Sequence, residues 1–252
     1  MTDFAPYMAA VAALAGLVIG SFLNVVIYRL PRKESLVRPG SHCPQCGHPV
    51  RWYDNVPVLS WLALRGRCRD CGERIAWRYP AVEALTGGSF LLAEVVYGPH
   101  PRAVLVMAFL AVLVTITFID MDHQIIPDRI VLPAAGVGLV AASALEPGRW
   151  WVYVVSSLGA AGFLLAIGLL WAGGMGFGDV KMALMMGAVL GSAVIVAMFV
   201  SFLVGGLTGV ALVLAGRKGR RDKVPFGPFL AVGSAVAALW GPAILDAYLR
   251  LL

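Results

Sequence analysis

The stretch YMAAVAALAGLVIGSFLNVVI, residues 7–27, decides the class of fold. It carries no charged side chain, and about 20 apolar residues in a helix are enough to cross the hydrocarbon core of a bilayer. Asp3 precedes the run and no Lys or Arg does, which is not the pattern of a cleaved signal peptide. We therefore expect a permanent membrane helix here.

The rest of the chain has the same character. It is 60% hydrophobic and 13% charged, with a mean hydropathy of +0.82, whereas soluble domains carry about 25% charged residues. The sequence predicts an all-α polytopic membrane protein with about eight transmembrane helices. In the run 180–215 it predicts either a short and a full helix hinged near Gly191, or two tilted helices. The expected helices cover residues 7–28, 81–98, 103–119, 130–145, 151–171, 180–190, 193–216 and 227–248.

The basic residues are sorted by loop. Of 20 Lys and Arg residues, 17 lie in the segment 29–78, at Arg129, at Lys181 or in RKGRRDK (217–223). Cytoplasmic loops are enriched in Lys and Arg, so we expect these loops in the cytoplasm. Eight helices then place both termini outside, and six would do the same. The net charge of +6 therefore predicts no nucleic-acid partner, and the expected partner surface is the lipid bilayer.

All four cysteines lie in the polar segment 29–80, as two CxxC pairs with 21 residues between them. The pairs stand in HCPQCGH (42–48) and RCRDCGE (67–73), and Gly47 and Gly72 suit a turn that aims amides at the sulfurs. Four thiolates complete a tetrahedral zinc site, and the reducing cytoplasm favours metal binding over a disulfide. With no open coordination position, a structural zinc is favoured over a catalytic metal, and a redox-active CxxC is the remaining alternative. The predicted ligands are Cys43, Cys46, Cys68 and Cys71, with His42 and His48 as neighbours.

Acidic residues gather at the end of the third apolar run, in TITFIDMDHQIIPD (115–128). Asp120 follows directly on apolar sequence, at the membrane boundary, where a carboxylate is costly and usually functional. Asp122 and Asp128 are equally well explained as a helix end entering water and as the first turn of the next helix. Asp120 is therefore the first candidate for a functional acid.

The stretch GMGFGDVK (174–181) places a second acid, Asp179, at the same expected depth. An acid that caps a helix explains Asp179, but it does not explain the glycines before it. Glycines also allow an extended peptide backbone to lie close to the acid. Two carboxylates at one depth predict an aspartyl protease pair, in which one holds a proton and the other deprotonates water. The glycines of this loop are Gly173, Gly174, Gly176 and Gly178.

Taken together, these motifs resemble those of the bacterial type IV prepilin peptidases, membrane aspartyl proteases of the GxGD type. The similarity runs nearly from end to end and implies a catalytic pair of Asp120 and Asp179, with Asp122 as the alternative to Asp120. It implies cleavage of the short basic leader of type IV prepilins or type II secretion pseudopilins, at the cytoplasmic face of the bacterial inner membrane. The active-site loop would contain Gly176, Gly178 and Lys181, although Lys181 is equally well explained as a surface lysine. The motifs are GSFLNVVIYRLP (20–31), HCPQCGH, CRDCGERIAWRYPAVE (68–83), FIDMDHQIIPD (118–128), GMGFGDVK and PFGPFLAVG (225–233).

The resemblance also implies a second reaction, N-methylation of the new amino terminus with S-adenosylmethionine. Relatives without the cysteine segment are proteases only, and this chain keeps the segment. Because the sequence has no GxGxxG fingerprint, the donor must be held in another way. Glu83 would deprotonate or pair with the nascent amine, unless it is only an acid at a helix start. The polar candidates for this site are Asn24, Arg29, Arg78, Tyr79 and Glu83.

Two other classes of protein are alternatives to a protease. A helix broken at 173–178, Glu94 and 29 glycines also suit a transporter or channel with a structural zinc module. No internal repeat supports that alternative, and a purely structural scaffold leaves the paired acids unexplained. The sequence thus predicts a first transmembrane helix over 1–28, a methyltransferase-associated zinc segment over 29–80, and a transmembrane aspartyl protease core over 81–252.

Overall fold

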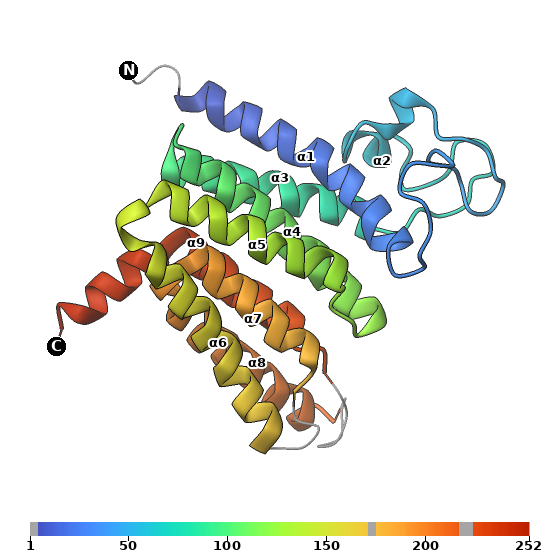
Figure 1. The fold of residues 1–252 in the computed structure, drawn as a ribbon. Helices are drawn as coiled ribbons and strands as arrows, with labels where there is room; N and C mark the ends of the chain where they lie inside the picture. Colours follow the sequence, from blue (N-terminus) through green and yellow to red (C-terminus); the bar gives the residue numbers. More distant parts are fainter. Residues whose placement is uncertain (1–4, 171–174, 217–223, 252) are drawn as a thin grey trace. The chain divides into compact units, whose positions relative to one another are not determined.

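A computed structural model of the chain describes residues 5–170, 175–216 and 224–251. The regular secondary structure of these residues is helical, with no β-strand, apart from two isolated β-bridges in the cysteine segment. The chain divides into two compact units, Met1–Ala103 and Val104–Leu252, and each is described by itself (Figure 1). The predicted boundaries at residues 28 and 80 concern activities rather than compact units, so they stay predictions.

Eight long helices in the described residues correspond one to one with the eight expected from sequence, which confirms the all-α prediction. Four short elements are also present, and of these only the break at η3 was expected. The short elements are η1 (Trp52–Asn55), α2 (Leu59–Ala63), η2 (Pro147–Arg149) and η3 (Gly191–Ala193). The long helices are α1 (Ala5–Arg29), α3 (Arg78–Tyr97), α4 (Pro101–His123), α5 (Asp128–Leu145), α6 (Trp150–Leu170), α7 (Phe177–Leu190), α8 (Val194–Leu214) and α9 (Gly227–Leu249).

Six stretches of the described residues are long and apolar enough to cross a membrane. They are α1, α4, α5, α6 with η2 before it, α9, and a continuous run through α7 and α8, whereas α3, which carries Glu83 and Glu94, is not among them. The 14 residues of α7 measure about 21 Å at 1.5 Å per residue, which is shorter than a hydrocarbon core of about 30 Å. The chain breaks after α7 at Gly191, where φ is +57°. The expected hinge between a short and a full helix is therefore confirmed.

In the first unit, α1 packs along α3 with their backbones close together (Figure 1). A Cβ at Gly16 would lie 2.8 Å from the Cα of Gly87, and one at Gly20 would lie 2.7 Å from the Cα of Glu83. Small residues four apart allow membrane helices to approach this closely. Gly16 lies opposite Gly87, and Gly20, four residues later on α1, lies opposite Glu83, four residues earlier on α3. The two helices therefore run antiparallel.

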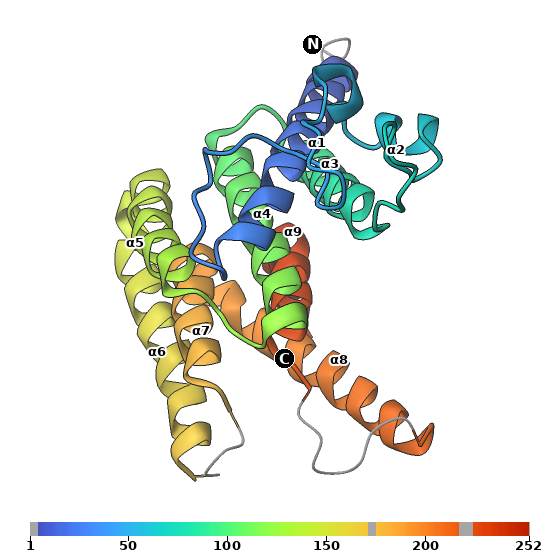
Figure 2. The ribbon, with the colours of Figure 1, turned by 90° about the vertical axis from the view of Figure 1, so that its right-hand side faces the viewer.

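In the second unit, α7 lies at the centre of the packing. It contacts α5, α6 and α9, and Figure 2 shows α5, α6 and α7 side by side. Met182, Met185 and Met186 on α7 are fully buried. The hydroxyl of Ser157 on α6 donates to the carbonyl of Leu184 on α7 over 2.7 Å. Because protein surrounds α7, the first turn of this helix is held in a defined place.

Candidate functional site

The four cysteine side chains converge on one point of the first unit. Their Sγ atoms all lie within 4.8 Å of one another, and those of Cys43 and Cys71 are 3.8 Å apart. Zinc–sulfur bonds of about 2.3 Å in a tetrahedron place neighbouring sulfurs about 3.8 Å apart. The spacing therefore fits a metal ion held by four thiolates. Nδ1 of His42 lies 3.0 Å from the carbonyl oxygen of Gly40, and His42 and His48 do not belong to the cluster of candidate ligands.

Each CxxC pair is folded into the same tight turn. Gly47 and Gly72 follow the pairs with φ of +70° and +73°, a conformation that favours glycine. The N–H of Gly47 donates to the carbonyl of Cys43 over 2.9 Å, and Gly72 makes the matching bond over 3.0 Å. A glycine turn thus follows each pair, and the glycine N–H of each turn is bonded to a carbonyl oxygen, not to a sulfur. Backbone hydrogen bonds from Cys46 and Gln45 lower the pKa of the Cys43 thiol to about 7, whereas the pKa of Cys71 is raised to about 12, because burial and the neighbouring cysteines outweigh the backbone hydrogen bond from Glu73.

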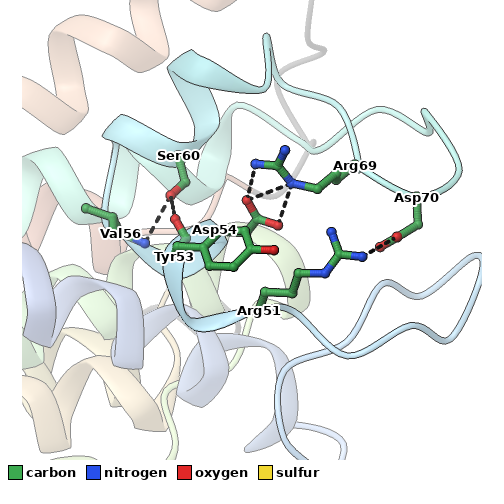
Figure 3. A network of polar contacts seen from close by, with 7 residues as sticks. All are labelled: Arg51, Tyr53, Asp54, Val56, Ser60, Arg69 and Asp70. Carbon is green, nitrogen blue, oxygen red and sulfur yellow. Dashed lines mark hydrogen bonds and ion pairs between the residues drawn. The ribbon is translucent and has the colours of Figure 1, made fainter.

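Two ion pairs connect the turn between Cys68 and Cys71 to residues 51–54, which follow the first cysteine pair. Arg69 lies between the two cysteines of the second pair, and its guanidinium binds both carboxylate oxygens of Asp54 over 2.6 to 3.1 Å. Arg51 binds Asp70 over 3.0 Å. Figure 3 shows the two pairs side by side. The hydrogen bonds from Arg69 hold the pKa of Asp54 below its usual range, so the pair stays charged at neutral pH.

A pocket of about 860 Å³ lies in the first unit between α1, α3 and the cysteine segment. This volume is within the range of about 300–1,000 Å³ that small-molecule sites occupy. Four of the five residues predicted for methyl transfer line it, namely Asn24, Arg29, Tyr79 and Glu83, and Arg78 does not. Two of the four cysteines also belong to its wall. The structure therefore brings most of the predicted set around one cavity.

The polar residues of this pocket differ in what they contact. Arg29 donates to the carbonyl of Ser35 over 2.9 Å and to that of Gly40 over 3.3 Å, so it holds the loop that forms part of the wall. Glu83 accepts the backbone N–H of Val58 over 2.7 Å. Because Val58 belongs to the cysteine segment, this bond fastens that segment to α3. Arg29 and Glu83 thus both shape the pocket.

In the second unit, Asp120 is an enclosed acid on α4. It is 5% exposed, and the backbone N–H of Gly227, at the start of α9, donates to its Oδ2 over 3.0 Å. A Cβ at position 227 would lie 2.7 Å from the same oxygen, so the contact depends on a glycine. Asp122, the alternative from sequence, is exposed. The structure therefore favours Asp120 as the first acid of the pair.

Asp179 is the matching acid in the first turn of α7. It is 8% exposed, and its Oδ2 accepts the backbone N–H of Gly176 over 3.0 Å. Asp120 is near enough for its charge to act on Asp179. Each acid therefore has one oxygen fixed by a glycine amide from the chain near a helix start.

The glycine loop before α7 is described only in part. A Cβ at Gly178 would lie 3.0 Å from Cβ of Ile126, in the loop between α4 and α5. The absence of a side chain at 178 thus lets the first turn of α7 approach the loop between α4 and α5. Gly173 and Gly174 lie outside the described residues.

Lys181 pairs with an acid outside the candidate pair. Its Nζ lies 2.7 Å from both carboxylate oxygens of Asp128, and 5.0 Å from the centre of the Phe177 ring. Asp128 is in the first turn of α5, as the sequence indicated. The structure thus gives Lys181 a role in joining α7 to α5, next to the candidate site.

Gly227 is the site residue that sequence reasoning did not assign. Its motif, PFGPFLAVG, carries part of the family resemblance but predicts no role for the glycine itself. The contact with Asp120 spans 107 positions, so no local pattern indicates it. The sequence offered one signal for Gly227: it stands between two Pro-Phe pairs, at the start of an expected membrane helix.

Comparison with known proteins covers nearly the whole chain. A family model described as the bacterial peptidase A24 N-terminal domain matches residues 14–97, and one described as the type IV leader peptidase family matches residues 107–210. A prepilin leader peptidase/N-methyltransferase of Aeromonas hydrophila is 37% identical, over 94% of this chain and 92% of its own length. A protein of the same name from Pseudomonas putida is 36% identical, over 98% of this chain and 95% of its own length. Another, from Bacillus subtilis, is 33% identical, over 97% of this chain and 99% of its own length. No solved structure matches the chain.

Proposed function

Because this chain belongs to the type IV leader peptidase family, we propose that it cleaves the leader of type IV prepilins or pseudopilins and then methylates the new amino terminus. The relatives are named for both reactions, and they match this chain over nearly its whole length. Membership of this family favours an enzyme over the transporter or channel that the sequence had left as the alternative.

We assign the proteolysis to Asp120 and Asp179. The observation that supports this most is the matched environment of the two acids, each enclosed and each bound at Oδ2 by a glycine N–H. In our proposal the other oxygen of each acid, Oδ1, is the one that acts on water and the peptide. One carboxylate removes a proton from water as it attacks the scissile carbonyl, and the other, protonated, donates to the carbonyl oxygen. When the tetrahedral intermediate collapses, the C–N bond breaks, the acid that took the proton from water gives it to the leaving nitrogen, and the other acid recovers its proton from a hydroxyl of the intermediate.

For the second reaction, S-adenosylmethionine supplies the methyl group. The free amine at the new terminus forms the C–N bond while the C–S bond of the donor breaks, and the amine gives up one proton. We place this chemistry at the pocket of the first unit, because that pocket holds four of the five predicted polar residues. The residues of this unit would bind and orient the donor and accept the proton.

The metal in the cysteine segment is zinc in our proposal. Four thiolate ligands suit zinc and leave no coordination position for a substrate. The metal would therefore shape the segment that closes the pocket, and it would take no part in either reaction.

We propose that the chain lies in the bacterial inner membrane with both active regions on the cytoplasmic side. The concentration of Lys and Arg in the segment 29–78 supports this orientation. The second basic cluster, RKGRRDK at 217–223, lies outside the described residues. We propose that both termini lie on the periplasmic side, because an even number of crossings, six or eight, returns the chain to the side on which it began.

The decisive experiment is mass spectrometry of a cognate prepilin after incubation with the protein and S-adenosylmethionine in lipid. We expect loss of the leader and gain of one methyl group. Asp120→Asn and Asp179→Asn should each reduce cleavage by about 10³-fold or more, and the double variant should be no worse, because the two acids act as a unit. Cleavage that survives in either single variant would contradict the assignment.

A further inference from the structure

The pocket of the first unit contains a buried acceptor without a partner. Asn24 is 5% exposed, and its Nδ2 donates to the carbonyl of Tyr79 over 3.1 Å. Only the nitrogen of an amide can donate to a carbonyl, so this bond fixes which way the amide is turned. Its Oδ1 is left buried with no hydrogen-bond donor. Such atoms are rare in folded proteins, and a bound ligand is one explanation for them.

A carboxylate lies one helical turn away from this acceptor. Gly20 packs against Glu83, and Asn24, four residues further along α1, bonds to Tyr79, four residues earlier on α3. Asn24 and Glu83 are therefore neighbours along the line where α1 meets α3, and both line the pocket. Glu83 is 8% exposed, so its charge is largely shielded from water.

Glu83 is held in place by groups that leave acceptor capacity unused. The N–H of Val58 binds its Oε2 over 2.7 Å, and the hydroxyl of Ser21 is within hydrogen-bonding reach. Val58 has φ of +60°, which is unusual for a β-branched residue, so the bond forms despite an unfavourable backbone conformation. A carboxylate accepts about four hydrogen bonds, and these two donors fill only part of that number.

We propose that Asn24 and Glu83 together bind a primary ammonium group in this pocket. The proposal rests on the methyl transfer proposed above. An ammonium group offers three N–H donors and a positive charge, which match the unpartnered Oδ1 and the enclosed carboxylate. The methyl-transfer reaction has two such groups, the α-ammonium of the methyl donor and the amino terminus of the cleaved substrate.

The test uses Glu83→Gln with a closely matched control. Glutamine keeps an oxygen that accepts the Val58 N–H, so the variant removes the charge and preserves the shape. Glu94→Gln is the control, because Glu94 is equally buried at 8% exposure on the same helix and does not line the pocket. Asn24→Leu removes the second acceptor at similar volume. Retained leader cleavage and retained bound metal show that each variant is folded.

The first measurement is equilibrium binding of two nonreactive probes to the full-length protein in lipid. Sinefungin carries the adenosine and the amino-acid end of the donor, whereas 5′-methylthioadenosine lacks the amino-acid end. If the donor supplies the ammonium, Glu83→Gln and Asn24→Leu weaken sinefungin binding by about 10- to 100-fold and leave methylthioadenosine binding unchanged. Glu94→Gln binds both probes as the native protein does.

The second measurement tests whether the bound ammonium group is instead the amino terminus of the cleaved substrate. If the substrate amine is the bound group, sinefungin binding stays normal, and the KM for a pre-cleaved peptide in methyl transfer rises by about 10- to 100-fold in Glu83→Gln and Asn24→Leu. If both variants bind the probes and the peptide as the native protein and Glu94→Gln do, the ammonium site is refuted. The proposed methyl transfer would not be affected by that result. A native protein that cleaves but never methylates would instead refute the proposed second reaction, and the inference with it.

Discussion

The cysteine segment and the second unit position their functional groups by different means. In the segment, the sulfurs that meet are at most 28 positions apart, and tight turns and exposed ion pairs hold them. In the second unit, the contact of Asp120 with Gly227 joins α4 to α9 across 107 positions, in a unit whose other helices pack closely around α7. The two regions therefore depend on different forces.

The comparison teaches where each region is vulnerable. Exposed ion pairs contribute about 0–1 kcal/mol each, which is too little to order a segment with few buried residues. A structural metal contributes about 10–16 kcal/mol of binding free energy in small zinc peptides. In the second unit, buried apolar side chains such as those of α7 stabilise the fold without a metal.

Removing the metal should have the largest effect, and it should affect the cysteine segment much more than the second unit. We expect chelation, or Cys68→Ser, to unfold the segment 29–78, to open its many arginines to trypsin, and to lower methyl transfer by about 100-fold or more. Leader cleavage should fall much less, because Asp120 and Asp179 lie in the second unit. Metal content by mass spectrometry, limited digestion and the two activities check this. Equal loss of both activities would show that the second unit also depends on the metal.

Gly227→Ala should have the next largest effect, in the second unit. The new Cβ would lie 2.7 Å from Oδ2 of Asp120 and displace that carboxylate. Misplacement of a catalytic group by about 1 Å costs on the order of 10²-fold in rate, so we expect leader cleavage to fall by about 10- to 100-fold. Gly206→Ala on α8 is the matched control, because a Cβ there meets open space. If cleavage rates of the two variants agree, the Gly227 contact does not position Asp120.

Lys181→Met should have the smallest effect. The pair that Lys181 forms with Asp128 is partly exposed, with 24% and 56% of the two side chains accessible. Because such pairs contribute about 0–1 kcal/mol, we expect cleavage to change by less than about threefold. Asp128→Asn should do the same. A loss above tenfold in Lys181→Met alone would show that Lys181 acts on the aspartate pair, as the sequence had allowed.

The fold could largely be predicted from the sequence because its signals are local. Apolar runs predicted all eight long helices, and Gly191 marked the break after α7. The CxxC spacing predicted four converging sulfurs. The elements η1 and α2 were missed, since five or fewer residues in a polar segment give no periodic pattern.

The contacts at the site could be predicted less well. Two acids at one membrane depth were visible in the sequence, but their glycine partners were not, because such contacts follow from helix packing. Arg29 was grouped with the methyl-transfer residues for its charge, and the structure shows it bound to the loop carbonyls of Ser35 and Gly40. Lys181 was placed near the aspartates by spacing, and its contact is with Asp128. Residue type and position indicate a site, whereas the partners depend on the three-dimensional fold.

The short length of α7 has a consequence for how this enzyme depends on its lipid. A lipid-facing helix of about 21 Å would suffer hydrophobic mismatch and tilt or thin the bilayer around it. α7 avoids this because α5, α6 and α9 pack around it and because Gly191 and Ala193, at the break that follows, are buried in protein. Membranes of different thickness therefore act on the outer helices, while the depth of Asp179 is set by its protein neighbours.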